Sequence, residues 1–162
     1  GSEVTIRLRA AAEPPPQAQE PAPRATGTTR RARCRILVAD DNQDSAESLA
    51  MLLRLSGHDV RTAHDGQEAV AIAQEFQPEV ALLDLGMPTL TGYDAARRIR
   101  EQPGGAKVVL IALTGWGQEE FRRRSRDAGF DHHLTKPVAV DALERLLDRT
   151  SQCLPERRLA AR

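Results

Sequence analysis

The 162-residue sequence lacks several features that define large classes of protein. Its longest hydrophobic run is the six residues from Val108 to Leu113, too short to cross a membrane. No basic and apolar N-terminal signal peptide is visible. The 23 Lys plus Arg balance the 23 Asp plus Glu, which argues against a strongly basic nucleic-acid binder. Cys34 and Cys153 match no metal or disulfide spacing. We therefore expect a cytoplasmic domain that by itself contacts neither nucleic acid nor membrane.

The composition changes along the chain. Residues 11–30 contain five of the ten prolines and no large apolar side chain, so this stretch cannot bury enough surface to offset the entropy of ordering it. We interpret residues 11–32 as a Pro/Arg-rich linker and residues 33–150 as the folded domain. Residues 151–162 are predicted to form a C-terminal tail.

Five short apolar runs alternate with helical patterns in the predicted domain. Strands are expected at 36–39, 58–63, 80–83, 108–113 and 130–134. Helices are expected at 44–56, around 69–76, through 95–99, at 118–128 and from about 140 onward, where apolar residues recur at helical spacing. Strands that are apolar on both faces and separated by helices indicate a parallel sheet covered on both sides. The predicted fold is a five-unit doubly wound α/β domain.

Polar residues follow four of the predicted strands. They are Asp40 and Asp41 after the first strand, Asp84 after the third, Thr114 after the fourth and Lys136 after the fifth. Ligands of doubly wound sheets bind beyond the carboxyl ends of the strands, so these side chains are expected to converge. Two carboxylates about 4 Å apart repel by about 4 kcal/mol at an effective dielectric near 20, so clustered acids require a cation.

Oxygen ligands of this kind suit Mg²⁺. Carboxylates, a hydroxyl, a lysine and Mg²⁺ are the components of phosphoryl transfer, and the acceptor can be an aspartate itself. The chain has only two lysines among its 23 Lys plus Arg, yet one of them is Lys136. A compact ammonium group suits a point contact with a phosphate oxygen.

Four sequence motifs in order resemble the receiver domain of two-component response regulators. They are Ile36-Leu37-Val38-Ala39-Asp40-Asp41, Leu82-Leu83-Asp84-Leu85-Gly86-Met87-Pro88, Ala112-Leu113-Thr114-Gly115 and Leu134-Thr135-Lys136-Pro137. The resemblance implies a flavodoxin-like sheet with strand order 2-1-3-4-5. It also implies that Asp84 is the phospho-acceptor, that Asp41 binds Mg²⁺ directly, and that Asp40 acts largely through water. Gly86 would supply a backbone carbonyl to the metal, and Thr114 and Lys136 would contact the phosphoryl oxygens.

Residues 1–10 suggest a second resemblance. Val4, Ile6 and Leu8 alternate on one face, which resembles the closing strand of a histidine-kinase ATP-binding domain. The order of kinase end, linker and receiver is that of a hybrid histidine kinase, an arrangement that is compatible with attachment of the parent chain to a membrane. The resemblance therefore implies a receiver that accepts a phosphoryl group from a kinase phosphohistidine domain or a histidine phosphotransferase.

One position departs from the receiver pattern. Many receivers have a switch aromatic three residues before the lysine, but this chain has His133. The neighbouring His132 would face the opposite side of the strand, so the pair is not expected to bind a metal.

Three alternatives remain open from the sequence. The first is the receiver of a separate response regulator that acts by binding a partner. The second is a Mg²⁺-dependent phosphatase, disfavoured because Gly86 stands where that chemistry usually has a second acid. The third is a flavin-binding domain, disfavoured because three acids at the mouth would repel phosphate.

Overall fold

The computed structural model describes residues 33–115 and 119–159. The predicted kinase remnant at 1–10 and the linker at 11–32 lie outside the described residues. In the described part of the chain, no helix is both long and apolar enough to cross a bilayer.

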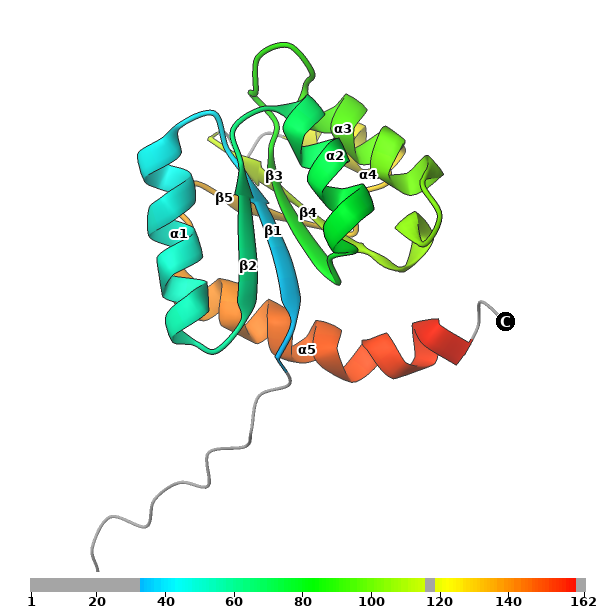
Figure 1. Ribbon diagram of the computed structural model, residues 1–162. Coiled ribbons are helices and arrows are strands. Elements are labelled where there is room, and N and C mark those ends of the chain that lie inside the picture. The colour runs from blue at the N-terminus through cyan, green and yellow to red at the C-terminus, as the bar shows by residue number, and fades with distance from the viewer. Residues whose placement is uncertain (1–32, 116–118, 160–162) are drawn as a thin grey trace, which may run out of the picture. The chain divides into compact units, whose positions relative to one another are not determined.

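The centre of the domain is a parallel sheet of five strands in the order β2-β1-β3-β4-β5 (Figure 1). The strands are β1 (Arg35–Ala39), β2 (Asp59–Ala63), β3 (Val80–Asp84), β4 (Val109–Thr114) and β5 (His132–Thr135). Every residue of β3 and of β4 is buried, as expected for central strands covered on both faces. The predicted fold class and strand order are confirmed.

Five α-helices cover the two faces of the sheet. They are α1 (Gln43–Leu55), α2 (Gly66–Phe76), α3 (Gly92–Glu101), α4 (Glu119–Asp127) and α5 (Val140–Leu159), and a 3₁₀ turn, η1 (Gly105–Lys107), precedes β4. Buried residues of α1 and α5, such as Leu53 and Leu143, share one core with the sheet. Buried residues of α2 and α3, such as Ala73 and Ile99, share the other. The sheet therefore has a separate hydrophobic core on each side.

Side-chain caps fix where three of the helices begin. Asn42, Asp65 and Thr91 precede α1, α2 and α3, and each accepts a hydrogen bond from the backbone N–H three residues later. Asn42 and Asp65 follow β1 and β2 closely, whereas Thr91 follows β3 after the longer loop at 85–91. The caps therefore set the length of the loops at the carboxyl edge of the sheet.

Most boundaries lie within a residue or so of the predicted ones, but two differ by more. The fifth strand begins at His132 rather than at residue 130, because the Phe130 N–H bonds to the Ser125 carbonyl and closes the end of α4. The last helix continues to Leu159, so the predicted boundary at residue 150 falls inside α5. Residues 140–154 contain neither glycine nor proline, so no helix-breaking residue ends the helix at residue 150.

Candidate functional site

The predicted site residues lie together at the carboxyl edge of the sheet. Asp40 and Asp41 follow β1, Asp84 ends β3, Thr114 ends β4 and Lys136 follows β5. Because all five strands are parallel, their carboxyl ends meet at this edge.

Three carboxylates form the centre of the site. Oxygens of Asp40, Asp41 and Asp84 lie within 4.8 Å of one another, and this is the only such acidic cluster in the described part of the chain. Asp40 and Asp84 are buried, at 1% and 8% exposed, whereas Asp41 is exposed. The cluster therefore opens to solvent on the Asp41 side, where an ion can enter.

Lys136 lies between two of these carboxylates. Its Nζ is 2.7 Å from Asp40 Oδ2 and 3.1 Å from Asp84 Oδ2. Burial by itself would lower the pKa of Lys136, but the hydrogen bonds and negative charges of Asp40 and Asp84 outweigh burial and raise the pKa above its usual value. Three carboxylates against one ammonium still leave an excess of negative charge, so the residues present fit a divalent cation with oxygen ligands.

Sequence reasoning missed the groups that hold the two buried carboxylates in place. Asp40 Oδ1 accepts a hydrogen bond of 3.0 Å from the Asn42 N–H, and Asp40 Oδ2 accepts one of 3.1 Å from the Ser45 hydroxyl. Asp84 Oδ1 accepts a weaker one of 3.3 Å from the Gly86 N–H. The capping pattern of Asn42 with Ser45 at the start of a helix was the available sequence signal.

Thr114 and His133 lie along the two paired strands β4 and β5. Thr114 is buried, and its carbonyl accepts a 2.8 Å hydrogen bond from the Lys136 N–H. His133 is half-buried opposite Ala112, while His132 is exposed. His133 also lines a surface groove together with Phe130 and Leu146. The pairing of β4 with β5 therefore connects Thr114 and Lys136 of the site to His133, the position where many receivers have an aromatic residue.

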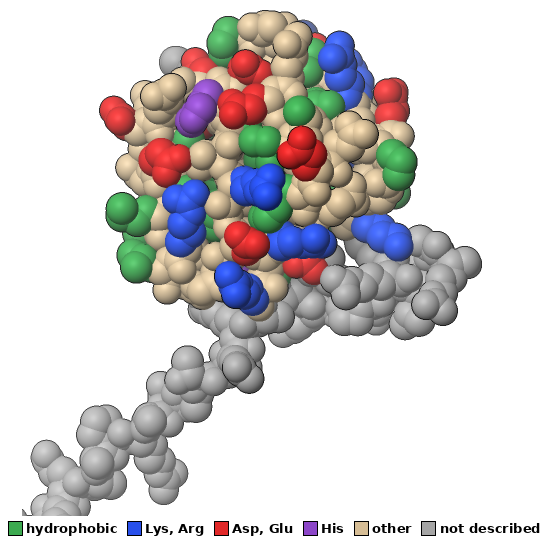
Figure 2. All heavy atoms as spheres, viewed as in Figure 1, with side chains coloured by type: hydrophobic (Ala, Val, Ile, Leu, Met, Phe, Trp, Pro, Cys, Tyr) green, Lys and Arg blue, Asp and Glu red, His purple; other side chains and the backbone are tan. Residues whose placement is uncertain are grey.

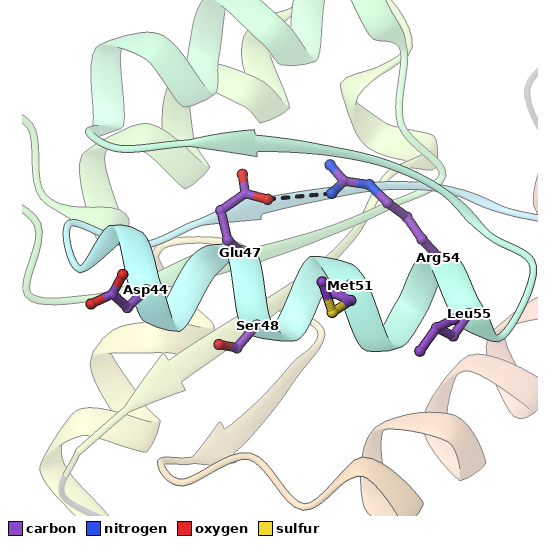
Figure 3. Close-up of a pocket in the computed structure, with 6 residues that line it drawn as sticks. All are labelled: Asp44, Glu47, Ser48, Met51, Arg54 and Leu55. Carbon is purple, nitrogen blue, oxygen red and sulfur yellow. Dashed lines mark hydrogen bonds and ion pairs between the residues drawn. The ribbon is translucent and has the colours of Figure 1, made fainter.

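The second half of α1 presents an exposed apolar surface. Met51, Leu52 and Leu55 are 63%, 42% and 79% exposed, and they are the large hydrophobic side chains that stand out from the described surface. Figure 2 shows hydrophobic side chains protruding at the left, over α1. Met51 and Leu55 line a shallow groove along this helix, shown in Figure 3.

Polar residues border that groove. In Figure 3, Glu47 and Arg54 lie on the side facing β2 and form an ion pair of 3.3 Å. Arg54 also donates to the Val60 carbonyl of this edge strand over 3.0 Å. Asp44 lies in the first turn of α1. The groove therefore runs along α1 from its start beside the acidic cluster.

The fold and this acidic edge define a known class of domain. The family model of the response regulator receiver domain matches residues 36–148, and the chain belongs to this family. It is therefore a receiver domain of two-component signalling.

Curated relatives come from both regulators and sensors. The chain is 33% identical over 125 residues to the DNA-binding dual master transcriptional regulator RpaA of Synechocystis, covering 75% of this chain and 52% of RpaA. It is 33% identical over 159 residues to the virulence sensor protein BvgS of Bordetella bronchiseptica, covering 93% of this chain and 13% of BvgS. The chain thus spans about half of one of these relatives and about an eighth of the other.

A solved structure of a receiver domain is similar in fold. The receiver domain of the sensor histidine kinase PA1611 from Pseudomonas aeruginosa, with magnesium coordinated in its active site cleft, superposes with a TM-score of 0.69 at 34% identity. The match covers 75% of this chain and 99% of that one.

Proposed function

We propose that Asp84 accepts a phosphoryl group from a phosphohistidine. The observation that supports this most directly is the position of Lys136, whose ammonium lies within 3.1 Å of Asp84 at the mouth of an acidic cluster. In the transfer, the P–N bond of the donor breaks and a P–O bond to an Asp84 carboxylate oxygen forms, so the donor imidazole is the leaving group. Lys136 and the Thr114 hydroxyl would then hold the phosphoryl oxygens.

Mg²⁺ is the metal that this donor set fits. Asp41, Asp84 and the Gly86 carbonyl would bind it directly, and Asp40 would act through water. The bound ion supplies positive charge that offsets the negative charge of the phosphoryl group as it moves. Before any ion binds, the hydrogen bonds from Asn42 and Ser45 already orient Asp40.

We further propose that the domain belongs to a hybrid sensor histidine kinase. The alignment with BvgS covers 93% of this chain and so extends beyond the receiver domain itself. The alternating Val4, Ile6 and Leu8 would then be the end of a kinase ATP-binding domain. The similarity to RpaA keeps a separate response regulator as the second candidate.

The exposed face of α1 is the proposed contact surface for the phosphohistidine partner. A protein donor must cover the mouth of the acidic cluster to bring its imidazole to Asp84, and α1 begins directly beside that mouth. Met51 and Leu55 lie farther along the same helix and expose apolar surface that a partner helix can bury. Asp44 and Glu47 add negative charge near the start of the helix.

Labelling with a small phosphodonor tests the proposed chemistry. With acetyl phosphate and Mg²⁺, we expect one phosphoryl group per chain, stable to acid and labile to base, and no labelling when EDTA removes the metal. Repeated turnover of phosphate esters would instead show a phosphatase, which the absence of an acid at Gly86 disfavours. Absence of any adduct on the intact chain would contradict the proposal.

A further inference from the structure

The loop between β3 and α3, residues 85–91, is attached to Asp84 at both of its ends. At its start, the Gly86 N–H donates to Asp84 Oδ1 over 3.3 Å. At its end, Gly92, the first residue of α3, packs against the Asp84 main chain, and its N–H points to the Leu85 carbonyl at 3.4 Å. The loop therefore folds back onto the carboxylate proposed as the phosphoryl acceptor.

Gly92 makes this return possible because it has no side chain. A Cβ atom at this position would overlap the Asp84 carbonyl oxygen, and would lie 2.9 Å from the Asp84 carbonyl carbon and 3.0 Å from Leu85 Cα. All three atoms belong to the backbone, so no side-chain rotation can relieve the clash. Any larger residue at 92 must displace α3 or Asp84 itself.

A second glycine supports the far end of the loop. Gly66, the first residue of α2, lies against Leu90, where a Cβ would overlap the Leu90 carbonyl oxygen and lie 2.8 Å from Leu90 Cβ. Leu90 is buried in the hydrophobic core on that side of the sheet. The loop is thus packed between the starts of two helices.

The loop also contains a strained residue. Thr89 has a φ of +66°, a left-handed conformation that is unusual for a β-branched side chain. Such conformations persist only where the surrounding structure fixes them. The contacts at Gly66 and Gly92 provide that constraint, so the loop is held in one shape although Thr89 alone would favour another.

We infer that Gly92 is a positioning residue for the site, and that its contact with Asp84, together with the Gly66 contact at Leu90, holds the 85–91 loop as a rigid support. This inference rests on the proposed function, because what the support fixes is the Asp84 carboxylate and the Gly86 carbonyl that would bind Mg²⁺. Neither glycine contacts the metal or the phosphoryl group.

The test compares two glycines that are equally crowded but differently placed. A Cβ at Gly105 in η1 would also overlap a backbone carbonyl oxygen, that of Ile99, and would lie 2.8 Å from its carbon, but η1 precedes β4 and so lies at the opposite end of the sheet from Asp84. Both Gly92→Ala and Gly105→Ala should lower the stability of the fold to urea. Only Gly92→Ala should also weaken Mg²⁺ binding, measured by calorimetry on folded protein, by about tenfold or more, as for other residues that orient metal ligands.

Gly105→Ala should keep the Mg²⁺ affinity within about twofold, because distant sites act independently. If Gly92→Ala and Gly105→Ala bind Mg²⁺ with equal affinity, whether that affinity is unchanged or reduced, the inference is overturned and Gly92 is an ordinary packing residue. If Gly92→Ala does not fold, Gly66→Ala replaces it in the same comparison with the same expected loss.

Amide hydrogen exchange tests the support in the unmodified chain. A rigid loop predicts that the N–H groups of Leu90 and Gly92 exchange almost as slowly as those of β3, whereas fast local exchange would contradict rigidity. This measurement needs no metal. If the unmodified chain bound no Mg²⁺, the proposed function would fail while the exchange rates still decided whether the support exists.

Discussion

The three acidic residues of the site differ in what surrounds each of them. Asp40 is buried and accepts hydrogen bonds from the Asn42 N–H, the Ser45 hydroxyl and Lys136. Asp41 is exposed, and Asp84 is buried beside the Lys136 ammonium. The three aspartates at this edge of the sheet therefore have different surroundings: Asp40 is held by several hydrogen bonds, Asp41 faces solvent, and Asp84, the proposed phosphoryl acceptor, lies beside the ammonium of Lys136.

Asp84→Asn is expected to abolish phosphorylation and leave the domain folded. The amide keeps the shape of the carboxylate but removes the nucleophile and the charge. Mass spectrometry after acetyl phosphate treatment should find one adduct on the unmodified chain and none on the variant, with circular dichroism as the control for folding. An undiminished single adduct on Asp84→Asn would show that another residue is the acceptor.

Asp40→Ala and Asp41→Ala should change stability in opposite directions when EDTA removes metal. Removing Asp41 relieves repulsion within the acidic cluster, which should raise the free energy of unfolding by less than about 1 kcal/mol at this exposed position. Removing Asp40 breaks buried hydrogen bonds and should lower it by about 1–3 kcal/mol. Urea unfolding measures both changes.

The same two variants should rank differently in metal binding. Calorimetric titration with Mg²⁺ is expected to show the larger loss of affinity for Asp41→Ala, the proposed direct ligand. Equal losses would argue against separate roles for the two residues.

The ion pairs of Lys136 should make stability depend on alkaline pH. Because the pKa of Lys136 is raised above 10.5 in the folded state, its stabilising contribution is fully present below pH 10.5 and is lost as the pH rises through the folded value. Without metal, the unfolding free energies of the unmodified chain and Lys136→Met should therefore converge only above pH 10.5. Lys107→Met, at the exposed second lysine, is the matched control. Its free energy of unfolding should differ from that of the unmodified chain by the same small amount at every pH. Convergence already at neutral pH would contradict the ion pairs.

At the scale of elements, continuous apolar runs predicted the central strands β1, β3 and β4, because parallel strands buried on both faces are hydrophobic throughout. The edge strands β2 and β5 contain polar residues, and their prediction depended on the alternation of strands with helices along the chain. The polar residues that follow the strands were likewise predictable, since parallel strands bring their carboxyl ends together. The loops were not: the left-handed Thr89 and the contact of Gly92 with Asp84 depend on how two helices meet the sheet. The exposed surface of α1 was also missed, because a single apolar stripe does not reveal which side chains remain uncovered.

Replacing the apolar surface of α1 should affect a protein donor and spare a small one. The double variant Met51→Ser with Leu55→Ser changes exposed side chains, so stability should change by less than about 0.5 kcal/mol per site. Transfer from the phosphohistidine domain of a histidine kinase should slow by about tenfold, the loss of about 1.4 kcal/mol of contact energy. Labelling by acetyl phosphate should stay unchanged, and Ala71→Ser on the exposed side of α2 is the matched surface control. Equal slowing with both donors would place the effect at Asp84 instead of at the surface.

At the scale of the whole molecule, the two ends of the sheet have different tasks. Asp84 and Lys136 lie at the carboxyl end, where the site opens to solvent. At the other end, the Arg100 guanidinium donates to the Gly129 carbonyl over 2.7 Å and pairs with Asp131 at 2.6 Å, joining α3 to the segment that leads into β5. The proposed chemistry at one end is therefore separated from the ion pair and hydrogen bonds that fix the strands at the other. The paired strands β4 and β5 connect the site to the surface formed by α4, β5 and α5.

We expect His133 to limit how far phosphorylation of Asp84 moves the surface formed by α4, β5 and α5. Its imidazole is half-buried beside Phe130 and Leu146, in the position where many receivers have an aromatic ring. Imidazole is smaller and more polar than a tyrosine or phenylalanine ring. Moving it toward Thr114 therefore buries less apolar area and gains less free energy, at about 25 cal/mol per Å². We therefore expect a beryllofluoride mimic of phosphorylation to shift the backbone amides around Asp84 strongly and those of α4 and β5 only slightly, as suits a domain that passes its phosphoryl group on.

The variant His133→Tyr tests that argument from ring size. A tyrosine ring offers more apolar area to bury, so the same mimic should produce larger amide shifts along α4 and β5 in the variant than in the unmodified chain. Thr114→Ala in the His133→Tyr background should remove the gain, because the ring would lose the partner toward which it moves. Large shifts along α4 already in the unmodified chain would show that a full switch operates with histidine, and that the size of the ring does not set its amplitude.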